Sequence, residues 1–130
     1  MHRVLLVDDD EDLLFIIGEY LDSNGIVFHL ADSAAHARKR LAHFNYDLVI
    51  SDFHMPGESG LDLFRWVSER YPELPFILMS GNLETRLRRE AISMGVSSFM
   101  EKPFELRELK RLINNSTRCV IRADERAPAA

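Results

Sequence analysis

Short apolar runs alternate with amphipathic segments along almost the whole chain, and this alternation constrains the fold more than any other feature of the sequence. The runs recur every ~20 to 30 residues and are rich in Val, Ile, Leu and Phe, which is typical of strands buried on both faces of a parallel sheet. They cover Arg3–Val7, Ile26–Leu30, Asp47–Ser51, Pro75–Met79 and Ser97–Met100. The sequence therefore predicts five buried strands.

Between these runs, apolar residues recur at spacings of three and four, which predicts amphipathic helices. The first helix is expected to carry Leu13, Ile17 and Leu21 on its inner face, and the last to extend from about Glu105 to about Ser116. Strict alternation of strand and helix, repeated five times, predicts a doubly wound α/β fold with helices on both faces of a parallel sheet. The expected strand order is 2-1-3-4-5, because only this order places the first and third strands together at a reversal of the winding.

Length and composition set the class of protein. The chain has 130 residues, of which 46% are hydrophobic and 28% charged, as in a globular protein with one domain. No apolar run approaches the ~20 residues that cross a bilayer, so a cytoplasmic location without membrane contact is expected. The net charge of −5, with no long basic run, disfavours direct binding of nucleic acid. Residues 1–122 are expected to form the domain, and residues 123–130 a flexible tail or the start of a linker.

Polar residues follow four of the five predicted strands at the point where each strand ends. Asp8 and Asp9 follow the first strand, Asp52 the third, Ser80 the fourth and Lys102 the fifth. Ligands of open parallel sheets bind outside the carboxyl ends of the strands, where the winding reverses. We therefore expect three carboxylates to converge at this edge of the sheet, with a lysine and a hydroxyl beside them.

This group of side chains indicates phosphoryl chemistry. Carboxylates a few ångströms apart repel one another in a partly desolvated cleft, so a cluster of them requires a positive charge. Mg²⁺ prefers a few carboxylate oxygens together with several waters, and Lys102 supplies a second positive charge that is expected to pair with Asp52. With Ser80 as a hydroxyl donor, the group suits phosphoryl transfer to a carboxylate nucleophile.

Several polar residues also have ordinary structural interpretations. Asp10, Glu11 and Asp12 are expected to favour the N-terminal dipole of the first helix. Asp52 alone is typical of a helix or turn cap, Lys102 alone of a surface lysine, and Ser80 alone is uninformative. Only their joint placement favours a site. The remaining histidines lack partners at ligand spacing and are expected to be solvated: His2, His29, His36 and His43.

Five segments resemble the receiver domain of bacterial two-component response regulators, in order and at the expected spacings. They are Leu5–Asp10, Asp47–Asp52, Met55–Gly57 with Gly60, Ile77–Gly81 and Phe99–Phe104. The resemblance covers Arg3 to about Ser116, which is nearly the whole chain. It implies a flavodoxin-like fold with five helices around the five-stranded sheet.

The resemblance also implies a role for each residue at the strand ends. It makes Asp52 the phosphoacceptor, and Ser80 and Lys102 the residues that bind the phosphoryl oxygens. A cis peptide bond between Lys102 and Pro103 is common in the family. The implied Mg²⁺ ligands are three carboxylates and one backbone carbonyl: Asp8, Asp9, Asp52 and His54.

By the same resemblance, Phe99 occupies the aromatic switch position of the family and would act with Ser80. Because Phe99 has no hydroxyl, a rotation of its ring is expected to change packing alone and no hydrogen bond. The output surface would be the fourth helix, the fifth strand and the fifth helix, near Arg86, Arg89 and Lys110. His54 and Asn82 occupy variable positions that influence the lifetime of the acyl phosphate in this family, so the sequence leaves that lifetime open.

The function implied is a signalling switch that depends on phosphorylation. It would accept a phosphoryl group from a phosphohistidine on a sensor histidine kinase or a histidine phosphotransfer protein. The protein would be no enzyme in the usual sense, although it would assist its own phosphorylation and the slow hydrolysis of the aspartyl phosphate. A free-standing receiver and a receiver that belongs to a larger regulator both fit the sequence.

Two other functions use similar residues. A phosphatase of the haloacid dehalogenase kind also uses an aspartyl nucleophile, Mg²⁺ and a lysine, and Asp8 with Asp10 resembles its first motif. However, no acidic pair at a strand end follows Lys102, and the chain has no room for a cap domain. A module that binds partners without phosphorylation is the other alternative, which the complete set of chemical positions disfavours.

Overall fold

The computed structural model describes residues 3–81 and 85–116 of the chain. Within these ranges, five parallel strands form one sheet in the predicted order β2-β1-β3-β4-β5. The strands are β1 (Arg3–Val7), β2 (Val27–Ala31), β3 (Leu48–Asp52), β4 (Phe76–Ser80) and β5 (Ser98–Glu101). The expected domain end after residue 122 and the tail at 123–130 lie outside the described residues.

The last four strands begin and end one residue later than the sequence predicted. The apolar runs stop at Ser51 and Met79, but the ladder of backbone hydrogen bonds continues through Asp52 and Ser80. Backbone pairing is indifferent to the polarity of a side chain, so the strands extend one residue beyond their apolar runs. As a consequence, Asp52 and Ser80 are held by the sheet itself and not by a loop.

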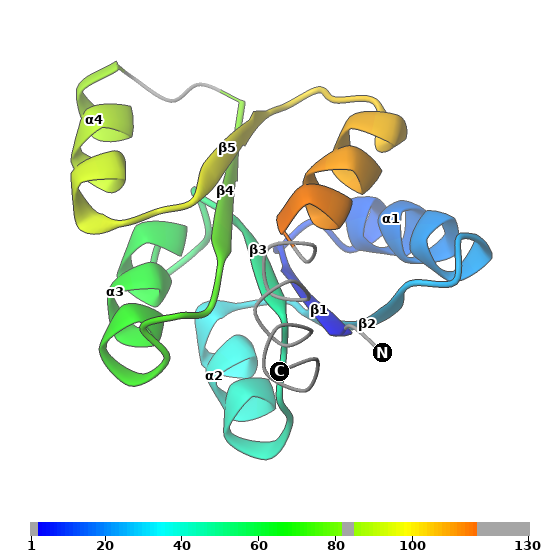
Figure 1. Ribbon diagram of the computed structural model, residues 1–130, viewed down its shortest axis with the longest axis horizontal. Helices are drawn as coiled ribbons and strands as arrows, with labels where there is room; N and C mark the ends of the chain where they lie inside the picture. Colours follow the sequence, from blue (N-terminus) through cyan, green and yellow to red (C-terminus); the bar gives the residue numbers. More distant parts are fainter. Residues whose placement is uncertain (1–2, 82–84, 117–130) are drawn as a thin grey trace, which may run out of the picture.

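Helices cover both faces of the sheet, with α1 and the last helix on one face and α2, α3 and α4 on the other (Figure 1). Their bounds are α1 (Glu11–Ser23), α2 (Ala34–His43), α3 (Gly60–Arg70) and α4 (Thr85–Met94), and residues 106–116 are helical to the end of the described range. Asp10, Ser33 and Ser59 cap the first three helices by accepting hydrogen bonds from backbone N–H groups. No described helix combines the length and the apolar character needed to span a membrane.

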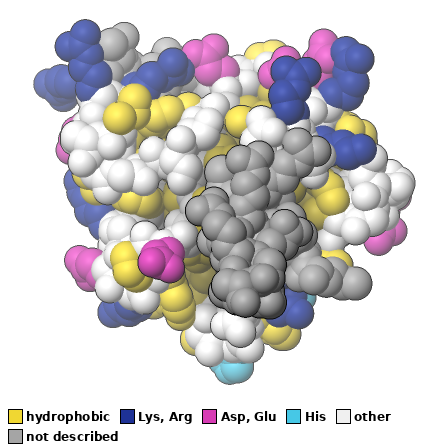
Figure 2. Space-filling view, viewed as in Figure 1, with side chains coloured by type: hydrophobic (Ala, Val, Ile, Leu, Met, Phe, Trp, Pro, Cys, Tyr) yellow, Lys and Arg dark blue, Asp and Glu magenta, His cyan; other side chains and the backbone are white. Residues whose placement is uncertain are grey.

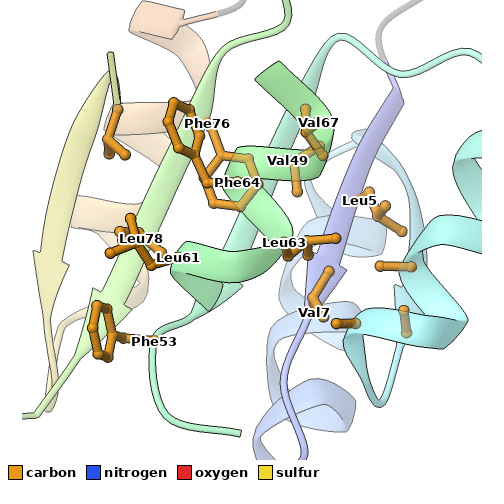
Figure 3. Close-up of a cluster of buried hydrophobic side chains, with 14 of the residues drawn as sticks. Leu5, Val7, Val49, Phe53, Leu61, Leu63, Phe64, Val67, Phe76 and Leu78 are labelled. Carbon is orange, nitrogen blue, oxygen red and sulfur yellow. The ribbon is translucent and has the colours of Figure 1, made fainter. Parts of the chain in front are cut away.

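The core consists of two clusters, one on each face of the sheet. On the face covered by α3, the side chains of Leu61, Phe64 and Val67 pack on Phe76 and Leu78 of β4 and its neighbours (Figure 3). On the other face, α1 and the last helix pack against the alternate residues of the same strands. Every residue of β3 and β4 is therefore buried, which fixes the strand register and aligns the carboxyl ends of the strands.

Helix α3 begins directly against the end of β3, and Gly60 makes this close approach possible. The Gly60 N–H donates a hydrogen bond of 2.9 Å to the carbonyl of Phe53. A Cβ atom at position 60 would collide with the backbone carbonyl of Asp52 and would lie 3.0 Å from Leu78 Cδ2. The close packing of α3 on the end of β3 thus depends on the absence of a side chain at this position.

His29 on β2 differs from its expected solvated state. Its ring is partly buried, with Nδ1 2.6 Å from the Tyr46 hydroxyl and the ring centroid 4.6 Å from that of Phe44. Burial lowers the pKa of His29, and the charges of Arg40 and Arg3 lower it further. The partners of His29 follow α2 in the chain, so its spacing from other histidines could not reveal them.

We predict that Gly60→Ala destabilises the protein by about 1–3 kcal/mol, the usual cost of inserting a methyl group into a packed site. The loss should occur although alanine favours helices, because the methyl group would displace either α3 or the end of β3. Urea denaturation measures the difference.

Gly81→Ala is the matched control, since a Cβ atom at position 81 would meet only the Lys102 carbonyl at 4.0 Å. This control should change stability by no more than about 0.5 kcal/mol. Equal effects of the two substitutions would show that the approach of α3 to β3 is not tight.

Candidate functional site

The carboxyl ends of the central strands bring three buried polar residues to one edge of the sheet. Asp8, directly after β1, is 0% exposed, Asp52 at the end of β3 is 6% exposed, and Ser80 at the end of β4 is 3% exposed. Asp9 follows Asp8 and is exposed to solvent. Buried carboxylates require compensation, so this edge is where a ligand or a partner charge is needed.

Asp8, Asp9 and Asp52 converge as the sequence predicted. Each of the three offers a carboxylate oxygen, and these oxygens all lie within 4.8 Å of one another. The acidic run after β1 is divided between two tasks, because Asp10 turns away and its side chain accepts a hydrogen bond from the Leu13 N–H. The Asp10 N–H in turn donates to Asp8 Oδ1 at 2.9 Å, which orients the Asp8 carboxylate.

Lys102 directly follows β5, the strand at the opposite edge of the sheet from β2, and its side chain reaches back to the carboxylates. Its Nζ lies 2.8 Å from Asp8 Oδ2 and 3.3 Å from Asp52 Oδ1, so the pairing with Asp52 is confirmed, and that with Asp8 is shorter. The Lys102 N–H donates to the Ser80 carbonyl at 3.0 Å, which extends the pairing of β4 and β5 to the site. The peptide bond from Lys102 to Pro103 is cis, as the resemblance implied.

These contacts shift the pKa values of two groups. Burial raises the pKa of Asp52, and the charge of Asp8 raises it further, while Lys102 opposes both effects. Burial alone would lower the pKa of Lys102, but its hydrogen bond to Asp8 and the charges of Asp8 and Asp52 outweigh this effect and raise the pKa. Lys102 is therefore a protonated cation, and a further positive charge near Asp52 would favour the ionised form of this carboxylate.

Ser80 faces the opposite side of the sheet from the carboxylates. In the ladder of β4 and β5, Leu78 pairs with Phe99 and Ser80 with Glu101, so these four side chains share the face that α4 covers. Asp52 pairs instead with Met79, whose side chain belongs to the core of the other face. Ser80 thus shares a face with Phe99, at the end of β4 and beside the carboxyl edge of the sheet.

Arg88 on α4 connects that helix to Phe99 in a way that the sequence did not reveal. Its guanidinium carbon lies 5.4 Å from the centroid of the Phe99 ring, and its NH2 atom lies 2.8 Å from Glu101 Oε1. Packing alone therefore does not hold the ring, because a cation–π contact adds to it. Phe99 and Glu101 follow Arg88 by 11 and 13 residues, and they meet it because β5 lies beside α4.

The remaining predicted residues have less defined places. The His54 side chain is exposed and its ring contacts that of Phe53, with centroids 4.8 Å apart. The proposed metal contact of the His54 carbonyl stays a prediction. Asn82 and His2 lie outside the described residues.

The family model for the response regulator receiver domain matches residues 4–114. The chain belongs to this family. Protein PetR of Rhodobacter capsulatus is 36% identical over 126 residues, which cover 97% of this chain and 53% of PetR. Response regulator protein FleR of Pseudomonas aeruginosa is 39% identical over 111 residues, which cover 85% of this chain and 24% of FleR. The chain thus spans about half or less of the length of these relatives.

Solved receiver structures show the same fold. A response regulator receiver protein from Pseudomonas putida superposes with a TM-score of 0.84 at 34% identity, over 88% of this chain and 96% of that one. The predicted flavodoxin-like sheet order is confirmed by the strand pairing itself. The receiver domain is a signalling domain, which agrees with the function implied by the resemblance.

We predict that Asp52→Asn stabilises the protein at neutral pH by about 1 kcal/mol. Like charges about 5 Å apart repel by roughly 3 kcal/mol at an effective dielectric constant of about 20, and Lys102 offsets only part of this repulsion. Because the pKa of Asp52 is raised, the folded protein binds this proton more tightly than the unfolded chain. Wild-type stability is therefore lost as the pH rises through that pKa, and the advantage of the variant should disappear on acidification.

Urea midpoints of both proteins across the acidic range measure this effect, with Glu73→Gln as a control that removes an exposed charge. A variant less stable than the wild type at neutral pH would show that Asp52 contributes more as a partner of Lys102 than it costs as a buried charge.

Proposed function

We propose that this receiver domain is a switch controlled by phosphorylation of Asp52. The observation that carries the proposal is the placement of a buried carboxylate between an acidic pair and a lysine at the edge of the sheet. An aspartyl nucleophile, a site for a divalent cation and a fixed ammonium group are the components of phosphoryl transfer without a separate base.

Asp52 is the acceptor because it combines three properties. Its Oδ1 lies 3.3 Å from Lys102 Nζ, it is held by the strand ladder, and one of its carboxylate oxygens lies within 4.8 Å of those of Asp8 and Asp9. In the transfer, an Asp52 oxygen forms a bond to phosphorus while the bond from phosphorus to the imidazole nitrogen of the donor breaks. The imidazole nitrogen takes the electron pair and later a proton from water, so the acceptor needs no general acid of its own.

The acidic cluster fits Mg²⁺. Ligand oxygens about 2.1 Å from a common cation lie roughly 3 to 4 Å apart, and the three carboxylate oxygens need only small movements to meet this requirement. Asp8, Asp9 and Asp52 carry three negative charges, which Lys102 alone does not balance, and the exposed Asp9 leaves room for water ligands. When bound, Mg²⁺ supplies positive charge to the oxygens of the transferring phosphoryl group.

Lys102 and Ser80 would hold the phosphoryl oxygens after the transfer. A phosphoryl group carries a charge of about −1.5 to −2 and three acceptor oxygens, which makes it a stronger partner for both donors than a carboxylate. To change a conformational ratio from 1:99 to 99:1, it must favour the active state by about 5.5 kcal/mol. Hydrogen bonds to charged groups contribute about 1.5–3 kcal/mol each, so two or three of them reach this size.

The movement of Ser80 would reach α4 through Phe99. Ser80 and Phe99 share one face of the sheet, and the ring contacts Arg88 of α4. The output surface would therefore be the face formed by α4, β5 and the last helix, which is the surface that the resemblance implies. The phosphoryl donor would be a phosphohistidine of a sensor kinase or a phosphotransfer protein, and the cytoplasmic location stays a prediction.

We predict that Asp52→Asn abolishes labelling by acetyl phosphate in the presence of Mg²⁺, because the amide is no nucleophile. Asp9→Asn should weaken Mg²⁺ binding on the order of tenfold and reduce labelling in parallel, since it removes one charged ligand. Mass spectrometry of the intact protein measures the label, and titration with Mg²⁺ followed by NMR measures the affinity.

Asp10→Ser is the matched control for these variants. It removes an acidic residue from the same run but preserves the N-cap of α1, and it should keep wild-type labelling. Labelling of Asp52→Asn at the wild-type level would contradict the proposed acceptor. A wild type that takes no label would favour a module that acts without phosphorylation.

We further predict that Phe99→Ala separates the chemistry from the signal. The ring lies on the other face of the sheet from the Asp52 carboxylate, so labelling should stay within about twofold of the wild type. The NMR shift changes that phosphorylation causes in α4 should become small, because the contact with Arg88 is gone. A loss of labelling would place Phe99 in the chemistry or the fold, and unchanged shifts in α4 would show that the signal takes another route.

A further inference from the structure

Helix α1 presents an acidic flank to the open edge of the sheet. It contains four acidic residues and no basic one. At 100° per residue, Phe15, Glu19 and Asp22 lie on the same flank as Gly18, whose Cα is close to the Phe28 ring of β2. Because β2 is the edge strand of the sheet, this flank faces outward beside it.

Helix α2 presents a basic flank to the same edge, from the other face of the sheet. It contains three Lys or Arg residues, two His and no acidic residue, although the net charge of the chain is −5. Arg40 donates to the Leu30 carbonyl of β2, which places its flank beside the edge strand. A groove of about 290 Å³ opens there, lined by His36, Lys39, Arg40, His43 and Phe44.

Exposed apolar side chains accompany both flanks. Among the described residues, four large hydrophobic side chains are clearly exposed, and Phe15, Ile16 and Phe44 are three of them. Phe15 is 66% exposed on the acidic flank, and Phe44 is 40% exposed in the basic groove. In Figure 2, an acidic side chain lies at the right, where Figure 1 has α1, and a histidine lies at the bottom, near α2.

We propose that the chain forms a twofold dimer across the β2 edge, in which α1 of each copy packs against α2 of the other. The two helices cover opposite faces of the sheet, so an acidic flank and a basic groove of one molecule do not meet. A twofold axis along the β2 edge inverts the faces of the second copy. It therefore places the acidic flank of each copy beside the basic groove of the other, which gives two equivalent contacts and a closed dimer.

The chemistry of the two surfaces favours a second copy as the occupant. Within the described ranges, the Lys39 amine and the Glu19 carboxylate have no hydrogen bond or ion pair, and both lie near the middle of their helices. The axis keeps α1 of one copy parallel to α2 of the partner. Glu19 and Lys39 then lie at similar positions along the axis. In this alignment Phe15 lies toward the His36 end of the groove and Phe44 at its opposite end, so each ring is buried separately and each adds an apolar contribution.

Sedimentation equilibrium of the full chain tests the proposal, over protein concentrations from about 1 μM to about 1 mM. We expect a monomer and a dimer in an equilibrium that weakens as salt is raised from about 0.05 M to about 0.5 M, because the screening length decreases. A protein that stays monomeric at the highest concentration in low salt overturns the proposal. Asp52→Asn should dimerise equally, so the result does not depend on the proposed phosphorylation.

A charge exchange identifies the helices involved. Lys39→Glu and Glu19→Lys each place like charges together twice in a symmetric dimer, and each should weaken it on the order of tenfold or more. An equimolar mixture of the two variants should recover the wild-type affinity as a mixed dimer, because both contacts then join opposite charges. Both residues are exposed, and circular dichroism checks that the variants are folded.

Arg89→Glu on α4 and Glu69→Lys on α3 are the matched controls, since they reverse exposed charges away from the β2 edge. They should leave dimerisation unchanged. A dimer that is sensitive to Arg89→Glu and insensitive to the exchange at positions 19 and 39 overturns the proposed interface. A mixture of the two charge variants that fails to recover affinity does the same.

Discussion

The ammonium group of Lys102, held between Asp8 and Asp52, is the interaction on which the functional edge of this protein depends. Two nearly inaccessible carboxylates at adjacent strand ends would otherwise repel each other without compensation. The lysine directly follows β5, at the other side of β4, so it also links the first and last thirds of the chain. Lys102 offsets the repulsion between Asp8 and Asp52 only when the whole sheet is assembled. The site therefore depends on the complete fold.

Much of this arrangement was accessible from the sequence, because it follows from rules that depend on local pattern and chain order. Alternating apolar runs and amphipathic segments predict the layers, and the reversal of winding places β1 beside β3. The proximity of Asp8, Asp52 and Lys102 can be predicted from this order, since the carboxyl ends of parallel strands share one edge. The error of one residue in four strands arose because side-chain polarity was used to end a strand, whereas backbone pairing continues past the first polar residue.

Other features were beyond the sequence because they depend on distances between surfaces. Gly60 was part of a recognised segment, but only the position of α3 against the Asp52 carbonyl shows why a side chain is not tolerated there. Arg88 and Phe99 have no periodic relation, and their contact exists because α4 and β5 lie side by side. His29 was expected in solvent, since its partner Tyr46 is provided by a loop that follows the next helix.

The division of polar groups between the two faces of the sheet has a consequence for how such proteins diversify. Asp52 belongs to one face, while Ser80, Phe99 and the residues of α4 belong to the other. The sheet separates these two groups, and Ser80 ends β4 at the carboxyl edge where both faces meet. Substitutions can therefore accumulate on the α4 side and create new recognition properties while the carboxylate cluster stays intact. A single inserted or deleted residue in β4 or β5, by contrast, would exchange the two faces and disconnect reaction from response at once.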